Sequence, residues 1–427
     1  MPVRATVEWT VKLRILLAAV LLVGCTTPYY SASKSPSPSA APTAVAAPTA
    51  TSTLTPTPAA DPSPSPSPAT SATKLTCGDS HIGAKAFAIY KYAMTSPWVE
   101  LLDVSNPVKP NLACTLMPAD GAHILSDTKL AFWNGDQLGT ADLSSGTPIA
   151  LTARLAGRAD TGAFNNDGTK FAYRTYDAAG AMRLQVFSKG SDLTLYVQQP
   201  MGGHGGPGPS AGPFDQLAFS PDGSLLLDYM LFRPPSGPPN LRVFRADGSI
   251  VFQTAGATGG VWSRTGSTLY FYTYNLSGPV TGDLNKLDAS GQRQVVASGL
   301  PVMNWAHMSP DGTDIIYNTS DSSVPDCGGV PHLWRFDLAT GSATQISSAI
   351  SSDPFFIQPN VVWSDEQKIT ACGPGGPSYP DGVILAHDLS TGKDATVDTT
   401  LVVPGIGGPQ LPPVTSFYLL DTWFAPA

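Results

Sequence analysis

The chain has 427 residues and a formal net charge of −8, and only 13% of its residues are charged. Because it is acidic and has no basic clusters, nucleic acid is excluded as an expected partner. Gly and Pro number 41 each. No amphipathic helical pattern is found along the chain, which favours an all-β protein.

Residues 1–24 have the pattern of a lipoprotein signal peptide. Basic residues precede an apolar run from Ile15 to Val23, which is too short to span a bilayer. The closing Gly24-Cys25 pair resembles the bacterial lipobox, which implies cleavage after Gly24 and lipidation of Cys25. We therefore expect an exported protein held by acyl chains on the extracytoplasmic side of a membrane. An ordinary signal peptide followed by a coincidental cysteine is the alternative.

Residues 25–74 begin with the cysteine and continue as a tract rich in Ser, Pro, Thr and Ala. The tract has almost no charge and no apolar period, so it cannot form a core and is predicted to be disordered. One interpretation is an extended stalk through a cell wall or periplasm. The other is a linker without a required length.

Residues 75–427 carry a repeated hairpin pattern and are predicted to form one domain. In Leu217–Tyr229 (L-A-F-S-P-D-G-S-L-L-L-D-Y), the Ser-Pro-Asp-Gly turn separates two apolar runs. Related turns occur at Asn165–Gly168, Ser263–Gly266 and Ser309–Gly312, and a copy without glycine is expected around Trp363–Asp365. The four turn glycines are 55, 43 and 46 residues apart. Such a period, filled with strands, is typical of repeat arrays.

A second turn recurs further along each unit. Its seven copies lie at Asp103–Asn106, Asp142–Gly146, Ser188–Gly190, Asp247–Gly248, Asp288–Gly291, Asp337–Gly341 and Asp388–Gly392. Two hairpins per unit give four antiparallel strands, which is one blade of a β-propeller. We predict seven blades, and six or eight remain open. A late strand, Val414–Phe424, is predicted to pair with the first unit and close the ring, because an open array would leave an exposed edge strand.

The S-P-D-G hairpins resemble the WD40-like repeats of the TolB propeller family, which also occur in the propeller domains of prolyl oligopeptidase-type peptidases. The resemblance covers roughly residues 80–400. It implies a β-propeller and, through the TolB-like relatives, protein partners in the cell envelope. The peptidase activity is not implied, because the separate hydrolase domain of those enzymes has no counterpart here.

Four cysteines follow Cys25, and we expect the disulfides Cys77–Cys114 and Cys327–Cys372 out of three possible connectivities. Neither a C-x-x-C pair nor histidines at ligand spacing occur, so no metal and no cofactor are predicted.

Ser210 lies in a G-x-S-x-G match, but no helix is expected after it, so we interpret this segment as a loop between blades. Residues at the ends of first strands are expected to pack between blades rather than to bind sugars: Phe164, Phe219, Trp262, Met308 and Trp363.

The long connections of a propeller lie on the face opposite its tight turns, and variable loops on a rigid scaffold are where function usually lies. The candidate ligand-binding residues in or beside these loops are Arg233, Tyr274, Asp283, Asp326, His332, Tyr379 and Asp381. We predict a monomeric, non-catalytic binding module for an envelope protein or glycan. The alternatives are an enzyme of the lyase or glycoside hydrolase kind, with its site in the central funnel, and a structural envelope component.

Overall fold

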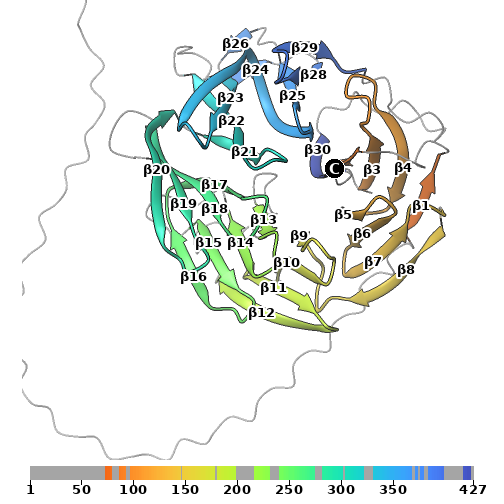
Figure 1. Cartoon of the computed structure of the whole chain (residues 1–427). Coiled ribbons are helices and arrows are strands. Elements are labelled where there is room, and N and C mark those ends of the chain that lie inside the picture. The colour runs from red at the N-terminus through yellow and green to blue at the C-terminus, as the bar shows by residue number, and fades with distance from the viewer. Residues whose placement is uncertain are drawn as a thin grey trace, which may run out of the picture. The chain divides into compact units, whose positions relative to one another are not determined.

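The computed structural model of the chain describes residues 73–78, 86–92, 97–145, 147–177, 180–198, 216–230, 240–274, 281–301, 303–321, 330–367, 371–373, 376–378, 383–398 and 417–424. It divides into Met1–Ser65, which lies entirely outside the described residues, and Pro66–Ala427. All regular elements of the described part are strands, and they form a ring of seven antiparallel blades, as predicted (Figure 1). No described helix is long and apolar enough to cross a membrane.

Blade 1 contains the closing strand. Its sheet runs in the order β1-β4-β3-β2-β30, with bounds β1 Lys74–Cys77, β2 Ala86–Tyr92, β3 Trp98–Asp103, β4 Asn111–Met117 and β30 Phe417–Phe424. β30 pairs antiparallel with β2, from Ala86↔Phe424 to Tyr92↔Phe417, and forms the innermost strand. The predicted closure of the ring by the C-terminal strand is therefore confirmed. The fifth strand, β1, covers the outer edge of β4.

Blades 2 to 5 are regular four-stranded sheets. Blade 2 has β5 Gly121–Ser126, β6 Lys129–Asn134, β7 Gln137–Asp142 and β8 Thr147–Arg154. Blade 3 has β9 Thr161–Phe164, β10 Lys170–Tyr176, β11 Met182–Ser188 and β12 Ser191–Gln198. Blade 4 has β13 Gln216–Phe219, β14 Leu225–Tyr229, β15 Leu241–Arg245 and β16 Ile250–Thr254. Blade 5 has β17 Ala257–Trp262, β18 Leu269–Tyr274, β19 Thr281–Leu287 and β20 Arg293–Pro301.

Blades 6 and 7 share one long strand. Blade 6 has β21 Asn304–Met308, β22 Asp314–Asp321, β23 Val330–Asp337 and the first part of β24 Ser342–Gln358. Blade 7 has the second part of β24, then β25 Val361–Gln367, β28 Val383–Asp388 and β29 Lys393–Thr396. A separate hairpin, β26 Ala371–Gly373 with β27 Gly376–Ser378, lies between β25 and β28 in the chain. β24 pairs with β23 up to Ile350 and with β25 from Ile350 onward, so the chain passes between these blades without a loop.

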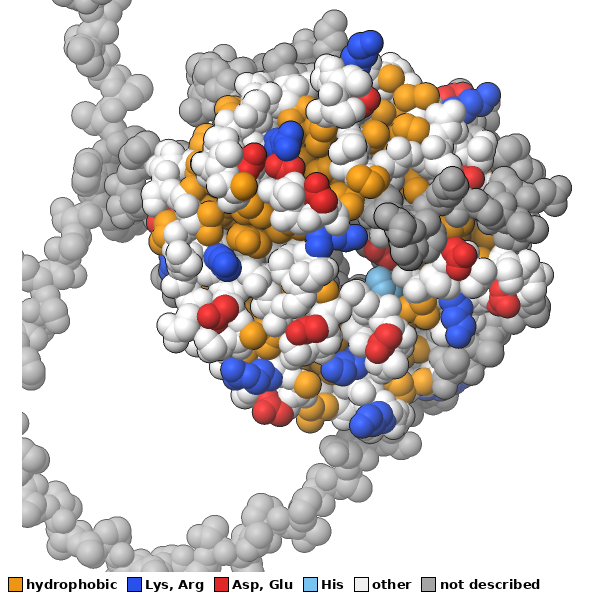
Figure 2. Space-filling model, viewed as in Figure 1, with side chains coloured by type: hydrophobic (Ala, Val, Ile, Leu, Met, Phe, Trp, Pro, Cys, Tyr) orange, Lys and Arg blue, Asp and Glu red, His pale blue; other side chains and the backbone are white. Residues whose placement is uncertain are grey.

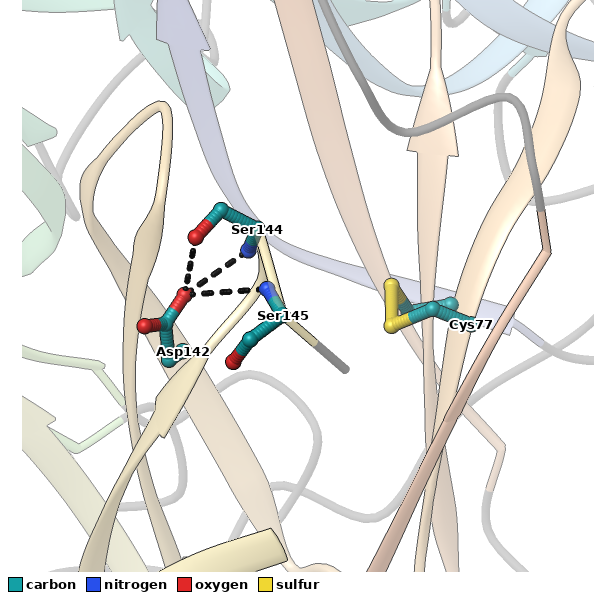
Figure 3. The surroundings of a disulfide bond; sticks show 5 residues. Cys77, Asp142, Ser144 and Ser145 are labelled. Carbon is teal, nitrogen blue, oxygen red and sulfur yellow. Dashed lines mark hydrogen bonds between the residues drawn. A yellow bond between two sulfur atoms is a disulfide. The ribbon is translucent and has the colours of Figure 1, made fainter. Parts of the chain in front are cut away.

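Local turn chemistry explains the repeated hairpins. Gly223 has a φ of 67°, and its N–H donates to Ser220 O at 2.7 Å, while Ser224 N donates to Asp222 Oδ1 at 3.1 Å. The third-to-fourth turns use the aspartate in a similar way. Asp142 Oδ1 accepts from Ser144 N at 2.8 Å, Ser144 Oγ at 2.6 Å and Ser145 N at 3.3 Å (Figure 3). The position of all seven third-to-fourth turns is as predicted.

Apolar contacts hold neighbouring blades together. Seven buried clusters occupy the seven interfaces between successive blades, including the interface between blades 7 and 1. Phe164, Trp262 and Met308 are buried at the ends of first strands, as predicted. Indole N–H groups add links between blades, because Trp262 Nε1 donates to Ala218 O at 3.0 Å and Trp363 Nε1 donates to Pro107 O at 2.9 Å. The core of the ring thus consists of the spaces between blades.

The prediction for the seventh hairpin is wrong in register. Trp363 lies on β25, which is the second strand of blade 7, and it packs against Phe355 of the first strand. The first turn of this blade is therefore at Pro359-Asn360, not after Asp365. The physical reason is that β24 continues from blade 6 into blade 7. Its second part is the innermost strand of blade 7, whereas the sequence pattern assigned that place to the segment with Trp363.

The disulfide Cys77–Cys114 is present and joins directly opposed residues of β1 and β4, as predicted (Figure 3). Cys327 lies outside the described residues, and so does the side chain of Cys372, so the second disulfide stays a prediction. The signal peptide, the lipidation of Cys25, the linker up to residue 72 and Ser210 also lie outside the described residues.

Candidate functional site

The structure describes three of the seven predicted ligand-binding residues. Tyr274 ends β18 and Asp283 lies on β19 one register step away, opposite Thr273. His332 lies on β23 of blade 6, opposite Thr319, whereas Tyr274 and Asp283 belong to blade 5. Arg233, Asp326, Tyr379 and Asp381 lie outside the described residues. The loop site therefore remains a prediction.

A row of serine, histidine and aspartate crosses three strands of blade 7. His387 Nε2 lies 2.7 Å from Ser364 Oγ, and His387 Nδ1 lies 2.8 Å from Asp394 Oδ1. His387 stands opposite Asp394 on the neighbouring strand. The order of groups is that of a hydrolytic triad, in which histidine takes a proton from serine and aspartate orients the ring.

Burial separates this row from a working nucleophile. Ser364 is 0% exposed and His387 is 1% exposed, whereas the side chain of Asp394 is 46% exposed. A nucleophile must reach the substrate, but Ser364 is fully buried and only Asp394, at the other end of the row, is accessible to solvent. We therefore interpret the row as a hydrogen-bond network that satisfies buried polar groups between strands.

A cavity of about 320 Å³ opens beside this row, between the third and fourth strands of blades 6 and 7. His387 and Asp394 belong to its wall on the side of blade 7, and Arg335 and Thr344 belong to the wall on the side of blade 6. Arg335 Nη2 donates to Asp314 Oδ2 at 2.8 Å, which fixes the guanidinium. The volume is at the lower end of the roughly 300–1,000 Å³ usual for ligand pockets.

A fully buried ionic network joins blades 3 and 4. Arg174 Nε donates to Asp228 Oδ1 at 3.0 Å, and Arg242 Nη1 donates to Asp228 Oδ2 at 2.9 Å. None of the three side chains is more than 1% exposed. Arg174 also donates to Tyr229 O at 2.8 Å, and the Arg242 guanidinium lies 4.1 Å from the centre of the Tyr196 ring. Because both guanidinium groups pair with the buried Asp228 carboxylate, we interpret this network as structural rather than catalytic.

A histidine and an aspartate meet on the innermost strands of blades 2 and 1. His123 Nδ1 lies 2.6 Å from Asp421 Oδ2, and the same oxygen accepts from Ile124 N at 2.9 Å. Burial, the largest influence, lowers the pKa of His123, but the charge and hydrogen bond of Asp421 overcome it, so the pKa is raised. His123 Nε2 is buried without a partner in the described part. Figure 2 shows basic, acidic and histidine side chains around the hollow at the middle of the ring.

Sequence reasoning missed all three networks, although a signal for one was present. Asp228 stands in the run L-L-L-D-Y and Arg174 in F-A-Y-R-T-Y, and a charged residue within an apolar strand needs a buried partner. The row of Ser364, His387 and Asp394 had no local signal, because its members are brought together by strand pairing. Within the described ranges, no group of three or more His, Cys, Asp or Glu residues could hold a metal ion.

Comparison with known proteins finds structural neighbours at low identity. No protein-family model matches the chain, and no curated protein matches it. Among solved structures, it is similar to an oligogalacturonate lyase in complex with manganese, at 14% identity and a TM-score of 0.49 over 74% of this chain and 91% of that chain. It is also similar to a TolB of Agrobacterium tumefaciens (13% identity, TM-score 0.37, 73% of this chain and 88% of that one). A TolB of Acinetobacter baumannii is similar at 16% identity and a TM-score of 0.36, over 72% of this chain and 77% of that one.

TolB proteins are thus among the structural neighbours. At these identities the likeness concerns the fold alone, because one propeller scaffold hosts many unrelated activities.

Proposed function

We propose that the chain is an exported, lipid-anchored propeller that acts as a non-catalytic binding module for a protein or glycan of the cell envelope. The observation that carries the proposal is the enclosure of the two groups that are arranged for acid–base chemistry among the described residues. Ser364 is fully buried, and so is the free ring nitrogen of His123. Neither acid–base row can present its reactive atom to a substrate, whereas the rigid ring suits binding.

Export is supported by the disulfide Cys77–Cys114, because such bonds persist in oxidising compartments outside the cytoplasm. The lipid anchor is supported by the lipobox-like Gly24-Cys25 pair. Metabolic labelling with a fatty acid tests the anchor. The full chain should incorporate label, and a Cys25→Ser variant should not.

A second candidate function is an enzyme with its site in the central funnel. His123 and Asp421 favour it, because they converge on the innermost strands and an aspartate-held histidine is a common general base. The enclosed Nε2 weighs against it in this conformation.

A pull-down from detergent-solubilised envelope tests the binding proposal. The full chain is the bait, and the control is a chain with residues 322–329 shortened and Cys327 and Cys372 replaced together. Specific retention of one protein or glycan by the full chain supports a binding module. Release of unsaturated sugars or reducing ends from envelope glycans, lost in a His123→Gln variant, would instead favour the enzyme.

A further inference from the structure

We propose that the cavity between blades 6 and 7 binds a protonated amine or a guanidinium group. This inference deepens the proposed binding function, and rests on it, by naming the ligand chemistry. The cavity of about 320 Å³ is lined mainly by polar side chains, with Arg335, His387, Asp388 and Asp394 among them, and Ile346 and Leu389 add apolar surface.

The cavity exists because apolar packing between these two blades is sparse. The buried cluster at this interface comprises four residues, Ile316, Leu333, Phe356 and Val362. They come from the first three strands of the blades. Toward the fourth strands, only Ile346 and Leu389 add apolar contacts, and the other residues that line the space are mainly polar. A wall of this kind places hydrogen-bonding groups around a hollow large enough for a small ligand.

The buried histidine fixes one carboxylate on the wall. An ionised carboxylate only accepts hydrogen bonds, so His387 Nδ1 donates to Asp394 Oδ1, and Ser364 Oγ donates to His387 Nε2. Both ring nitrogens of this nearly inaccessible imidazole are then satisfied in its neutral form. Because the Asp394 side chain is 46% exposed, it keeps carboxylate surface for a ligand while its orientation is set from behind.

Two further carboxylates at the cavity are held by their own turns. Asp337 Oδ1 accepts from Ala339 N at 2.8 Å and Thr340 N at 2.9 Å. Asp388 Oδ1 accepts from Ser390 N at 2.9 Å and Ser390 Oγ at 2.6 Å. These hydrogen bonds favour the ionised forms, and they leave the other carboxylate oxygen of each residue for a ligand.

The one guanidinium among the described residues of the cavity wall is already neutralised. Arg335 Nη2 donates to Asp314, which is 5% exposed and whose Oδ1 has no hydrogen-bond partner among the described residues. The described wall therefore carries three carboxylates, Asp337, Asp388 and Asp394, against one guanidinium, so its net charge is negative. Arg335 also attracts Asp337, and Lys393, opposite Asp388 in the register, is not among the lining residues. Such a wall attracts a cation and repels carboxylates, sulfates and phosphates. Both a small free amine and a basic side chain of a protein carry the required group.

The test measures binding to the full chain in detergent by calorimetry. The probes are agmatine, a free cation with both groups, and a short unstructured peptide with one lysine and one arginine, and glucuronate is the anionic comparison. The chain offers a matched control for Asp388→Asn. Asp247 makes the same turn contacts, to Ser249 N at 2.8 Å and Ser249 Oγ at 2.6 Å, but lies in blade 4, away from the cavity.

We expect at least one cationic probe to bind, and binding to weaken about fivefold or more in Asp388→Asn and in Asp394→Asn, as for the loss of one charge-assisted contact. The amide oxygen introduced by Asp394→Asn would still accept from His387, and a thermal melt confirms that each variant is folded. Asp247→Asn should bind like the original chain. Binding of agmatine alone identifies a small amine as the ligand, and preference for the peptide identifies a protein chain.

The assignment is overturned if no heat of binding is detected at high concentrations of either cationic probe. It is also overturned if Asp388→Asn and Asp247→Asn lose the same binding affinity, or if glucuronate binds as tightly as agmatine. These results are separable from the failure of the proposed function. An envelope partner retained in the pull-down, with no cation bound, leaves the binding module intact and removes the cavity from it. Cation binding without any retained partner does the reverse.

Discussion

His123 Nδ1 and Asp421 Oδ2 lie 2.6 Å apart, and they connect blade 2 with the C-terminal strand that closes the ring. About a fifth of each side chain is exposed, so the pair is only partly screened by solvent. We predict that Asp421→Asn lowers the free energy of unfolding by about 1–2 kcal/mol, because it loses a charge-assisted contact to histidine and weakens the bond from Ile124 N.

Chemical denaturation of the full chain measures this loss. Asp136→Asn is the control, because the Arg154–Asp136 pair is 3.9 Å apart and the arginine is largely exposed. Equal stability changes in the two variants would contradict a special role for the closing strand.

The same pair predicts a pH dependence. The pKa of His123 is raised above its unfolded value, so its contribution is fully present below the unfolded pKa and is lost as pH rises through the folded pKa. Burial lowers the pKa of His307 to about 4, so His307 has the opposite effect and destabilises the fold as pH falls. Because both the original chain and Asp421→Asn contain His307, the contribution of His307 cancels in the difference between their melting temperatures. This difference should be larger near about pH 5.5 than near about pH 8.5, and a difference that is flat or grows with pH would refute the assignment.

The buried network of blades 3 and 4 predicts an order of effects. Asp228→Asn leaves two buried guanidinium groups without their carboxylate and should cost about 3–5 kcal/mol. Arg174→Met leaves the balanced pair of Asp228 and Arg242 and should cost less. Urea unfolding of both variants gives the order, and a larger loss in Arg174→Met would show that its bonds to backbone carbonyls matter more than charge balance.

The disulfide predicts a loss of stability on reduction. Cys77 and Cys114 are 37 residues apart, which corresponds to at most about 4 kcal/mol in the chain-entropy account. A Cys77→Ser, Cys114→Ser double variant should melt at a lower temperature than the original chain. Because Cys327–Cys372 is also predicted, dithiothreitol should lower the melting temperature of this variant further, and no further drop would contradict the second disulfide.

Local chemistry made most of the fold predictable. The turn at Asp142 depends on contacts within residues 142–145, and the turn Ser220–Gly223 also lies within four residues, so the sequence pattern locates both. The closing strand was predictable because an open array of blades would leave an exposed edge strand. Trp363 was assigned to the wrong strand because β24 runs through two blades without a turn, and no local pattern marks that continuity.

The polar networks were less predictable, since each depends on register between strands or on contact between blades. Asp394 is inconspicuous in the sequence and becomes informative only opposite His387. The contact between Arg174 and Asp228 joins different blades, and the pair His123–Asp421 joins residues that are far apart in the sequence. Residue types within single strands indicate that a partner is needed, but they do not identify it.

The disulfide between β1 and β4 also determines how the ring responds to mechanical tension. Pulling on the chain before Lys74 can peel β1 from β4 only as far as Cys77, where the covalent bond passes the load to Cys114. The force then enters the sheet at β4 and bypasses residues 78–113. The pairing of β2 with β30, which closes the ring, is therefore not in series with the N-terminal pull.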